Sequence, residues 1–140
     1  MFTKDEAQFR CHGDSEENIA EYGQGCGCGF SLPEGGMKQA EIDLLNLIQD
    51  TCVARYGETA VFSCSCGYRC QVHNDRLPGS VPNSEHVQGM AADCLVPECM
   101  SVDEFAALAV ACGAGGVGKY WSMGMVHVDC GPRRDWTEAD

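Results

Sequence analysis

Residues 84–93 read SEHVQGMAAD, and this short stretch decides how the rest of the chain is interpreted. It places His86 and Asp93 seven residues apart, with Gly89 and two alanines between them. Imidazole and carboxylate groups are both good zinc ligands. The small residues would let a loop that carries His86 approach a strand that carries Asp93. A histidine and an aspartate at this spacing also occur by chance, so the stretch alone leaves a metal site open.

Two predicted strands place a second histidine beside this pair. We expect strands at about 90–96 and 123–130, and side chains alternate between the two faces of a strand. Asp93 and His127 therefore point to one spot if the two strands pair, and His86 lies on the loop that leads into the first strand. Two histidines and a carboxylate leave a fourth position open, which is typical of catalytic zinc, whereas structural zinc usually has four protein ligands.

The remaining patterns predict an α+β fold with a small antiparallel sheet and helices packed on one face. Residues 38–56 carry apolar side chains at helical spacing, and Ser101–Glu104 form a capping box that begins a helix ending near Cys112. We expect a strand at 59–65, a polar loop at 71–83, a glycine-rich turn after Cys112 and a polar C-terminal tail. We divide the chain into a cysteine- and glycine-rich segment, 1–36, docked on a main domain, 37–140.

The glycine-rich stretch 113–119 matches two nucleotide-binding patterns, G-x-G-x-x-G and G-x-x-x-x-G-K. Both patterns require a strand before the glycines and a helix after them. Here a predicted helix comes first and a strand follows, and Tyr120 stands where a P-loop needs Ser or Thr. We therefore expect these glycines to shape a turn and not to bind nucleotide.

Charge and composition exclude several classes of partner. The 140 residues include nine basic and twenty-one acidic side chains, which gives a net charge of −12. Nucleic-acid phosphates and anionic membrane surfaces repel such a chain. No apolar run reaches the ~20 residues of a membrane span. The start, MFTKDEAQFR, lacks the apolar region of a signal peptide. We therefore expect a soluble chain.

Eleven cysteines are present, an odd number, so at least one is not in an intramolecular disulfide. They are Cys11, Cys26, Cys28, Cys52, Cys64, Cys66, Cys70, Cys94, Cys99, Cys112 and Cys130. Disulfides, buried reduced thiols and a second, cysteine-bound zinc all remain open. The two clusters, around Cys26 and around Cys66, lack the C-x2-C pairs typical of zinc fingers.

A longer pattern resembles a known family. In order, the chain carries Cys66-Gly67-Tyr68-Arg69, His73-Asn74, Asn83-Ser84-Glu85-His86, Gly89, Ala91-Ala92-Asp93, Gly115-Gly116-Val117-Gly118-Lys119-Tyr120, Val126-His127-Val128-Asp129 and Arg134-Asp135-Trp136. This order is similar to that of the zinc D-alanyl-D-alanine carboxypeptidases and related peptidoglycan peptidases, which share the fold of the hedgehog signalling domain. The resemblance covers about residues 37–136. The earlier FRC…CGCGF resembles a leader found before such domains.

The resemblance assigns roles to individual residues. It implies that His86, Asp93 and His127 bind Zn²⁺. Arg69 is the candidate for binding a substrate carboxylate or the developing oxyanion, because its planar fork donates two parallel hydrogen bonds, with a surface salt bridge as the alternative. Ser84 is either a substrate-binding residue or a cap or turn residue.

The catalytic base is the least certain role. Several relatives place an acid three residues before the last histidine ligand, where this chain has Gly124. Asp129 is then either the base or the residue that orients a ligand histidine. We expect His73 to pack within the loop, and we assign no role to His12.

The family resemblance implies a zinc-dependent peptidase that hydrolyses amide bonds in peptidoglycan stem peptides. We expect a D-Ala-D-Ala carboxypeptidase or a cross-link endopeptidase. An L-alanyl-D-glutamate endopeptidase, as in phage endolysins, is one alternative, and a non-catalytic, zinc-holding binding module is another. We expect a monomer that degrades the cell wall outside the cytoplasm or in the periplasm, including after release by lysis.

Overall fold

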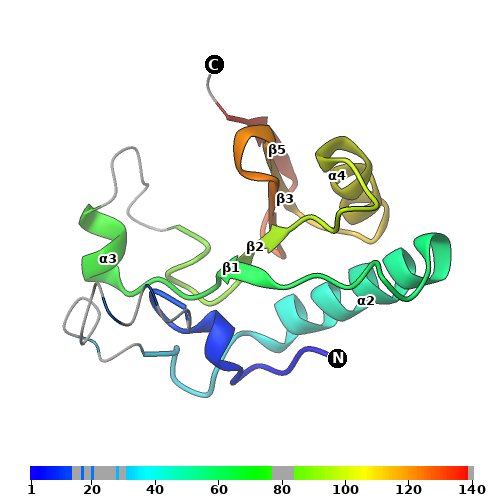
Figure 1. The fold of residues 1–140 in the computed structure, drawn as a ribbon. Coiled ribbons are helices and arrows are strands. Elements are labelled where there is room, and N and C mark those ends of the chain that lie inside the picture. The colour runs from blue at the N-terminus through cyan, green and yellow to red at the C-terminus, as the bar shows by residue number, and fades with distance from the viewer. Residues whose placement is uncertain (14–16, 18–19, 21–27, 29–30, 77–83, 139–140) are drawn as a thin grey trace.

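The computed structural model describes residues 1–13, 17, 20, 28, 31–76 and 84–138, arranged as Figure 1 shows. The helices are η1 (Ala7–Phe9), α2 (Gln39–Tyr56), α3 (Gln71–Arg76), α4 (Val102–Ala111) and η2 (Trp121–Met123). The strands are β1 (Cys64–Cys66), β2 (Ala91–Leu95), β3 (Gly116–Tyr120), β4 (Met125–Asp129) and β5 (Arg134–Thr137). This mixture of helices with one five-stranded sheet confirms the α+β class. Among these residues no helix is both long and apolar enough to span a bilayer.

The two long helices form where the sequence predicts them. On α2 the side chains of Ile42, Leu45, Ile48 and Cys52 are at most 1% exposed, and they share one helical face. The helix ends before Gly57, whose φ of 96° favours glycine.

The capping box at the start of α4 is also confirmed. Ser101 Oγ accepts a hydrogen bond from the Glu104 backbone N–H, and Glu104 Oε1 accepts one from the Ser101 N–H, both at 3.0 Å. These two bonds satisfy backbone donors that the first turn of a helix leaves without partners.

The strand order in the sheet is β1-β2-β4-β3-β5. The first four strands pair in antiparallel fashion, and β5 adds a parallel edge next to β3. The pairing of β2 with β4 sets Asp93 directly opposite His127. The predicted convergence of these two side chains is therefore present in the register of the sheet.

Four local predictions were wrong. The strand expected at 59–65 is limited to Cys64–Cys66, and the loop expected at 71–83 begins with helix α3. The glycine-rich turn expected after Cys112 contains strand β3, and the polar tail expected at the C-terminus contains strand β5. Most side chains of β5 are exposed, so this edge strand has no apolar alternation that the sequence could reveal.

The glycines of β3 make room for side chains of neighbouring strands. A Cβ atom on Gly116 would overlap the Asp129 carboxylate, and one on Gly118 would overlap the Trp136 ring. Both are buried within a strand, where glycine is otherwise unfavourable. Glycine here therefore reflects a close approach across the sheet and not a turn.

The two faces of the sheet have different environments. Alternate residues of β2 and β4 join the hydrophobic core together with buried side chains of α2 and α4. The strand residues in the core are Ala92, Cys94, Val126 and Val128. The intervening residues Asp93, His127 and Asp129 belong to the opposite face. Polar chemistry is thereby separated from the core by the thickness of the sheet.

The N-terminal residues 1–13 pack against the rest of the chain. Phe2 and Phe9 are buried in the core, and the Phe2 N–H donates to Asn46 Oδ1 of α2 at 2.6 Å. The Tyr68 N–H donates to Phe9 O at 2.8 Å. In Figure 1 this blue segment runs beside α2 toward α3.

No disulfide joins the cysteines that the structure describes, so the expected disulfide framework is not found there. Cys26 lies outside the described residues. Cys52, Cys64 and Cys94 are instead buried as thiols in the core. Burial raises the pKa of the Cys52 thiol to about 11, and burial also raises that of Cys94. Such thiols are unreactive near neutral pH.

Glu41 is an acidic residue buried on α2. Its side chain is 0% exposed, and neither carboxylate oxygen has a hydrogen-bond partner among the described residues. Burial raises its pKa well above the usual 4.5, and Cys130, Cys64 and Asp129 act in the same direction. Above pH 4.5 the unfolded chain loses this proton while the folded chain keeps it, so the stability contributed by Glu41 falls as pH rises.

We predict that Glu41→Met raises the free energy of unfolding at pH 7 by about 1–3 kcal/mol, the usual cost of an unsatisfied buried polar group. The gain should shrink as the pH is lowered toward 4.5, where the unfolded chain also keeps the proton. Urea unfolding at several pH values measures both effects. Gln39→Met, at an exposed position of the same helix, controls for methionine itself. A gain independent of pH would contradict a neutral Glu41.

Candidate metal centre

Three predicted ligands meet on the face of the sheet that lies opposite the core. Asp93 Oδ1 lies 3.4 Å from His86 Nε2 and 3.3 Å from His127 Nδ1. Asp93 and His127 come from the paired strands β2 and β4, and His86 comes from the turn before β2. Both histidines are nearly buried, at 3% and 6% exposed. The structure therefore brings together the three residues that the sequence singled out.

The turn that carries His86 is fixed by its own backbone and by Ser84. The His86 N–H donates to Ser84 Oγ at 3.2 Å, and the His86 carbonyl accepts from the Gly89 and Arg69 N–H groups at 3.2 and 3.1 Å. Gly89 has a φ of +70°, and a Cβ there would contact Pro33. The small residue thus permits the backbone turn that brings His86 over β2. Ser84 lies in this structure as a turn residue.

The hydrogen bond of His86 fixes which of its nitrogens is free to bind a metal. Nδ1 lies 2.7 Å from the carbonyl oxygen of Gly67, which can only accept a hydrogen bond. Nδ1 therefore carries a proton, and Nε2, the atom that faces Asp93, is the nitrogen left to bind a metal.

Asp129 fixes the tautomer of His127 in the same way. His127 Nε2 lies 2.7 Å from Asp129 Oδ2 and donates its proton to this carboxylate. The lone pair of His127 is then on Nδ1, which also faces Asp93. A metal-binding histidine commonly donates its other N–H to a carboxylate or a carbonyl group, and both forms occur here.

Asp129 itself has every acceptor position engaged. Its side chain is 0% exposed; Oδ1 accepts from the Gly116 and Gly131 N–H groups at 2.8 and 3.0 Å, and Oδ2 also accepts from Arg134 at 2.9 Å. Burial alone would raise its pKa, but the bonds from His127, Gly131 and Gly116 lower it. A saturated carboxylate with a lowered pKa is a weak base, so this geometry favours orientation of His127 over proton transfer.

The three facing atoms form an incomplete set without a cation. Burial would raise the pKa of Asp93, but His86 and His127 lower it well below its usual range, so the carboxylate is ionised. Burial would lower the pKa of His86, but Cys66 and Asp93 raise it well above its usual range, so a positive charge is favoured between the rings and the carboxylate. The two distances from Asp93 Oδ1 are close to the ~3.3 Å expected between neighbouring ligands in a tetrahedron with ~2.0–2.1 Å bonds. The residues present therefore fit a zinc ion.

Cys66 offers a competing ligand on the other side of His86. Cys66, His86 and Asp93 form a group whose ligand atoms lie within 4.8 Å of one another. However, Cys66 Sγ lies 3.8 Å from His86 Nδ1, the nitrogen already bonded to Gly67. The thiol thus approaches the protonated side of the ring, and we prefer His127 as the third ligand.

Trp136 forms a wall beside the centre. Its ring centroid lies 4.7 Å from that of His127. The Arg134 Cζ atom lies over the Trp136 ring, 4.6 Å from the ring centroid. The Trp136 Nε1–H donates to the Tyr120 hydroxyl at 2.8 Å. This placement depends on Gly118, whose missing side chain leaves the space that the indole occupies.

The Arg69 guanidinium makes one hydrogen bond within the fold and has another nitrogen donor without a partner among the described residues. Its Nη1 donates to Asn74 Oδ1 of α3 at 3.0 Å, and Asn74 is fully buried. Its Nε is buried without a hydrogen-bond partner among the described residues. The alternative for Arg69, a surface salt bridge, is not found among the described residues, where its side chain bonds to an amide. A buried, unpartnered guanidinium donor is suited to an anionic group.

Gly124 lies three residues before His127, where several relatives carry an acid. It closes η2 with a φ of +62°, and a Cβ there would meet no atom within 4 Å. The backbone conformation therefore matches glycine, and the position supplies no proton acceptor.

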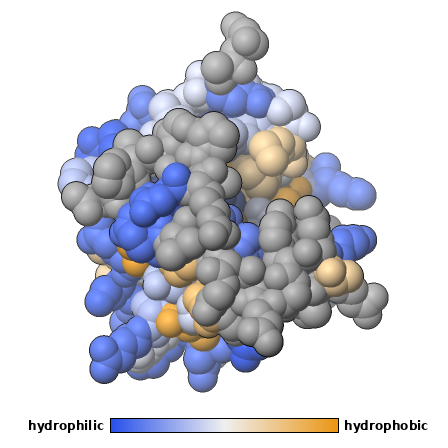
Figure 2. All heavy atoms as spheres, turned by 90° about the vertical axis from the view of Figure 1, so that its left-hand side faces the viewer, coloured by the Kyte–Doolittle hydropathy of each residue, from blue (hydrophilic) through white to orange (hydrophobic). Residues whose placement is uncertain are grey.

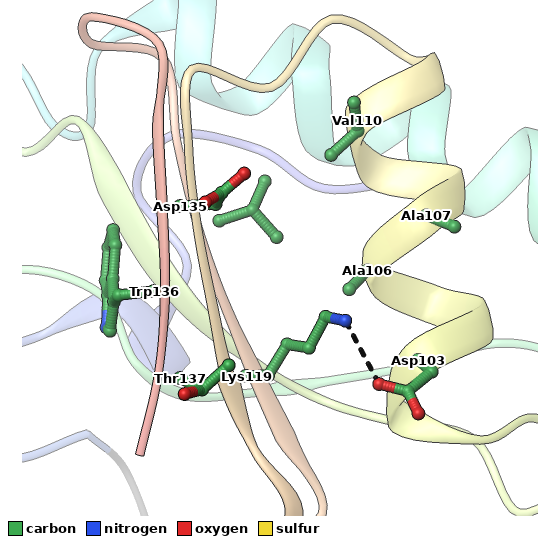
Figure 3. Close-up of a pocket in the computed structure, with 9 residues that line it drawn as sticks. Asp103, Ala106, Ala107, Val110, Lys119, Asp135, Trp136 and Thr137 are labelled. Carbon is green, nitrogen blue, oxygen red and sulfur yellow. Dashed lines mark ion pairs between the residues drawn. The ribbon is translucent and has the colours of Figure 1, made fainter. Parts of the chain in front are cut away.

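A pocket of about 290 Å³ lies on the other side of the sheet, between α4 and the strands β3 and β5. Figure 3 shows Asp135 and Thr137 on the pocket side of β5 and Trp136 pointing away from it. The ion pair between Lys119 and Asp103, at 3.1 Å, lies across this pocket. It is separate from the centre around His127.

The sequence reasoning gave too little weight to a second group of possible ligands. Cys11, His12 and His73 lie together, as do Cys11, Cys28 and Cys70. His73, predicted to pack within a loop, lies in the first turn of α3 beside Cys70. The Cys70-x2-His73 spacing was the available signal, since it brings two ligands onto one turn of a helix.

Comparison with known proteins gives one match. The family model described as Peptidase M15 matches residues 23–129, a range that contains His86, Asp93, His127 and Asp129. No curated protein and no solved structure matches the chain.

We predict that Asp129→Asn lowers zinc affinity by roughly 10–100-fold, because loss of the carboxylate frees the His127 ring to change its tautomer. Competition with a chromophoric chelator measures this affinity. Asp135→Asn removes a carboxylate that is 74% exposed on β5, and it should leave the affinity unchanged. Equal affinities for wild type and Asp129→Asn would show that His127 does not depend on this bond.

Proposed function

The chain belongs to the peptidase M15 family, and on that premise we propose that it is a zinc peptidase that hydrolyses amide bonds in the stem peptides of bacterial peptidoglycan. The family is one of metallopeptidases, so the chain has the domain of a metal-dependent hydrolase. The observation that carries the proposal is the convergence of two histidine rings on the Asp93 carboxylate.

We assign His86, Asp93 and His127 as the metal ligands, through Nε2, a carboxylate oxygen and Nδ1. Two imidazoles with one carboxylate suit zinc and leave the fourth position open for substrate or water. When bound, zinc polarises a carbonyl group and lowers the pKa of a bound water to ~7. The part played by the chain is to hold the two rings in the required tautomers through Gly67 and Asp129.

Asp129 is, on this proposal, a positioning residue and not the catalytic base. Its four hydrogen-bond donors keep it ionised and directed at His127. Arg134 adds a positive charge that offsets the cost of burying this carboxylate.

Arg69 is proposed to bind an anionic part of the substrate. Its bond to Asn74 and its backbone bond to the His86 carbonyl hold it against the turn that carries a ligand. The buried, unpartnered Nε would then pair with a carboxylate or with the oxyanion of the reacting amide. Ser84 borders the same turn and is proposed to contact substrate as well as to hold His86.

A carboxylate partner for Arg69 favours substrates that end in a free carboxyl group. We therefore propose D-Ala-D-Ala carboxypeptidase or cross-link endopeptidase activity, with an L-alanyl-D-glutamate endopeptidase as the enzymatic alternative. Such a reaction takes place at the cell wall, outside the cytoplasm.

A binding module that holds zinc without catalysis is the rival from another class. Gly124 favours it, because the position that carries an acid in several relatives has neither a side chain nor a neighbouring group here. Both proposals require the metal, so hydrolysis itself distinguishes them.

We predict that the zinc-loaded protein releases terminal alanine from purified peptidoglycan or cleaves its cross-links, and that a chelator abolishes this activity. Mass spectrometry of the digested muropeptides measures the products and identifies the bond. His127→Ala should lose both the metal and the hydrolysis, because one of three ligands is gone. Intact muropeptides from folded, zinc-loaded protein would instead support the binding module.

We further predict that Arg69→Ala lowers kcat/KM by about 10–150-fold for a substrate with a free C-terminal carboxylate, as expected for loss of ~1.5–3 kcal/mol from charged hydrogen bonds. The same substitution should matter much less for a C-terminally amidated substrate. Arg55→Ala, at the exposed end of α2, is the control. An equal loss on both substrates would show that Arg69 does not bind the terminal carboxylate, and would contradict the preference for substrates with a free carboxyl group.

A further inference from the structure

Three separate segments meet beside helix α3, away from the centre described above. Cys11 and His12 follow η1, Cys28 comes from the stretch before α2, and Cys70 and His73 flank the start of α3. Figure 1 shows the blue N-terminal segment reaching α3 on this side of the molecule. Figure 2 views the molecule from this side, where the described surface is mostly hydrophilic with a few separate hydrophobic patches.

The ligand atoms of these residues form two overlapping groups that share Cys11. The Sγ atoms of Cys11, Cys28 and Cys70 lie within 4.8 Å of one another. Cys11 Sγ also lies 3.3 Å from His73 Nδ1. Cys70 Sγ accepts a hydrogen bond from the His73 backbone N–H at 3.4 Å, so these two residues share the first helical turn.

Burial supports a built site over a chance encounter at the surface. Cys11 is 0% exposed and Cys70 is 8% exposed, while Cys28 and His73 are half-buried. Two histidine rings stack at the edge of the cluster, with the centroids of His12 and His73 separated by 3.9 Å. The stack restricts the orientation of the His73 ring and directs its Nδ1 at Cys11.

We propose that Cys11, Cys28, Cys70 and His73 bind a structural zinc ion, through three Sγ atoms and Nδ1. Three thiolates and one imidazole make a closed tetrahedral set, which is the usual composition of structural zinc sites. His12 lies outside this set and packs on His73. The site differs from the open set of His86, Asp93 and His127 in its ligands, in its elements and in having no vacant position.

This second ion would tie the N-terminal segment to α3. Metal binding adds directly to folding, so this link would strengthen the attachment that Phe2 and Phe9 already make to the core. A second consequence rests on the proposed function. Helix α3 carries Asn74, which holds Arg69, so a zinc ion that fixes α3 would also help to position Arg69 for substrate. The zinc site itself does not depend on peptidase activity.

Metal content tests the proposal directly. The wild-type chain is purified without added metal, loaded with Zn²⁺ and freed of unbound ion. Elemental mass spectrometry should then find two zinc ions per chain. Cys70→Ser and His73→Ala should each hold about one, and so should Asp93→Asn, which removes a ligand of the other centre. Cys99→Ser, an exposed cysteine outside the cluster, should keep both ions. A wild-type content of one ion, unchanged by Cys70→Ser, would overturn the site.

Cobalt spectroscopy covers the case in which a cysteine variant does not fold. The cobalt-loaded wild type should show an intense sulfur-to-cobalt charge-transfer band, which two imidazoles and a carboxylate cannot produce. The band should persist in Asp93→Asn, where the proposed active centre is damaged. Its absence from folded, cobalt-loaded wild type would refute the thiolate site while leaving the peptidase proposal standing.

A thiol count separates zinc from disulfides. After denaturation with a chelator and without reductant, all eleven cysteines should react with a thiol reagent. A deficit of two or more that is traced by peptide mapping to Cys11, Cys28 or Cys70 would show a disulfide and contradict the proposal.

Discussion

The register of β2 against β4 is the constraint on which the rest of the site depends. It sets Asp93 directly across from His127, and the adjacent residues on both strands point into the core. A slip of one residue would turn Asp93 toward α2 and α4 and bring an apolar side chain to the metal face. The hydrophobic core therefore fixes the face on which Asp93 and His127 lie, because a slip of one residue would remove Cys94 and Val126 from the core.

Strands β3 and β5 stabilise Asp129, the residue that orients His127. Asp129 lies at the end of β4, where burying a carboxylate without partners would cost several kcal/mol. Gly116 of β3 provides both the space and a backbone donor for it, and Arg134 of β5 provides a positive charge. Two elements that carry no metal ligand thus determine which nitrogen of His127 faces Asp93. The late part of the chain is required for the centre even though it seems irregular in the sequence.

Local patterns predicted the elements that bury apolar side chains. Helix α2, the capping box of α4 and the strands that carry Asp93 and His127 were predicted from the spacing of residue types in the sequence. The position of Asp93 opposite His127 was predicted in the same way. The strand β3 was missed because its glycines serve contacts with Asp129 and Trp136, which are distant in sequence. The cluster of Cys11, Cys28 and Cys70 was left open for the same reason, since nothing local shows that η1 lies beside α3. His86 was placed on the correct loop, but its tautomer depends on Gly67, which only the fold brings near.

The turn before β4 explains why the geometry is compatible with both proposals, a peptidase and a binding module. Gly124 adopts the left-handed conformation that costs most residues about 1–2 kcal/mol, and a side chain there would point into open space. The two carboxylates that contact His127, among the described residues, are Asp93 and Asp129, and both are held ionised by their neighbours. Neither is poised to take a proton from water. On the proposed peptidase function, hydrolysis would not use either of these carboxylates as its base, and a binding module would need the same orientation of the two imidazoles to retain its ion. The features proposed to hold the metal are thus common to both proposed functions, and the groups proposed to meet substrate, Arg69 first among them, would distinguish one from the other.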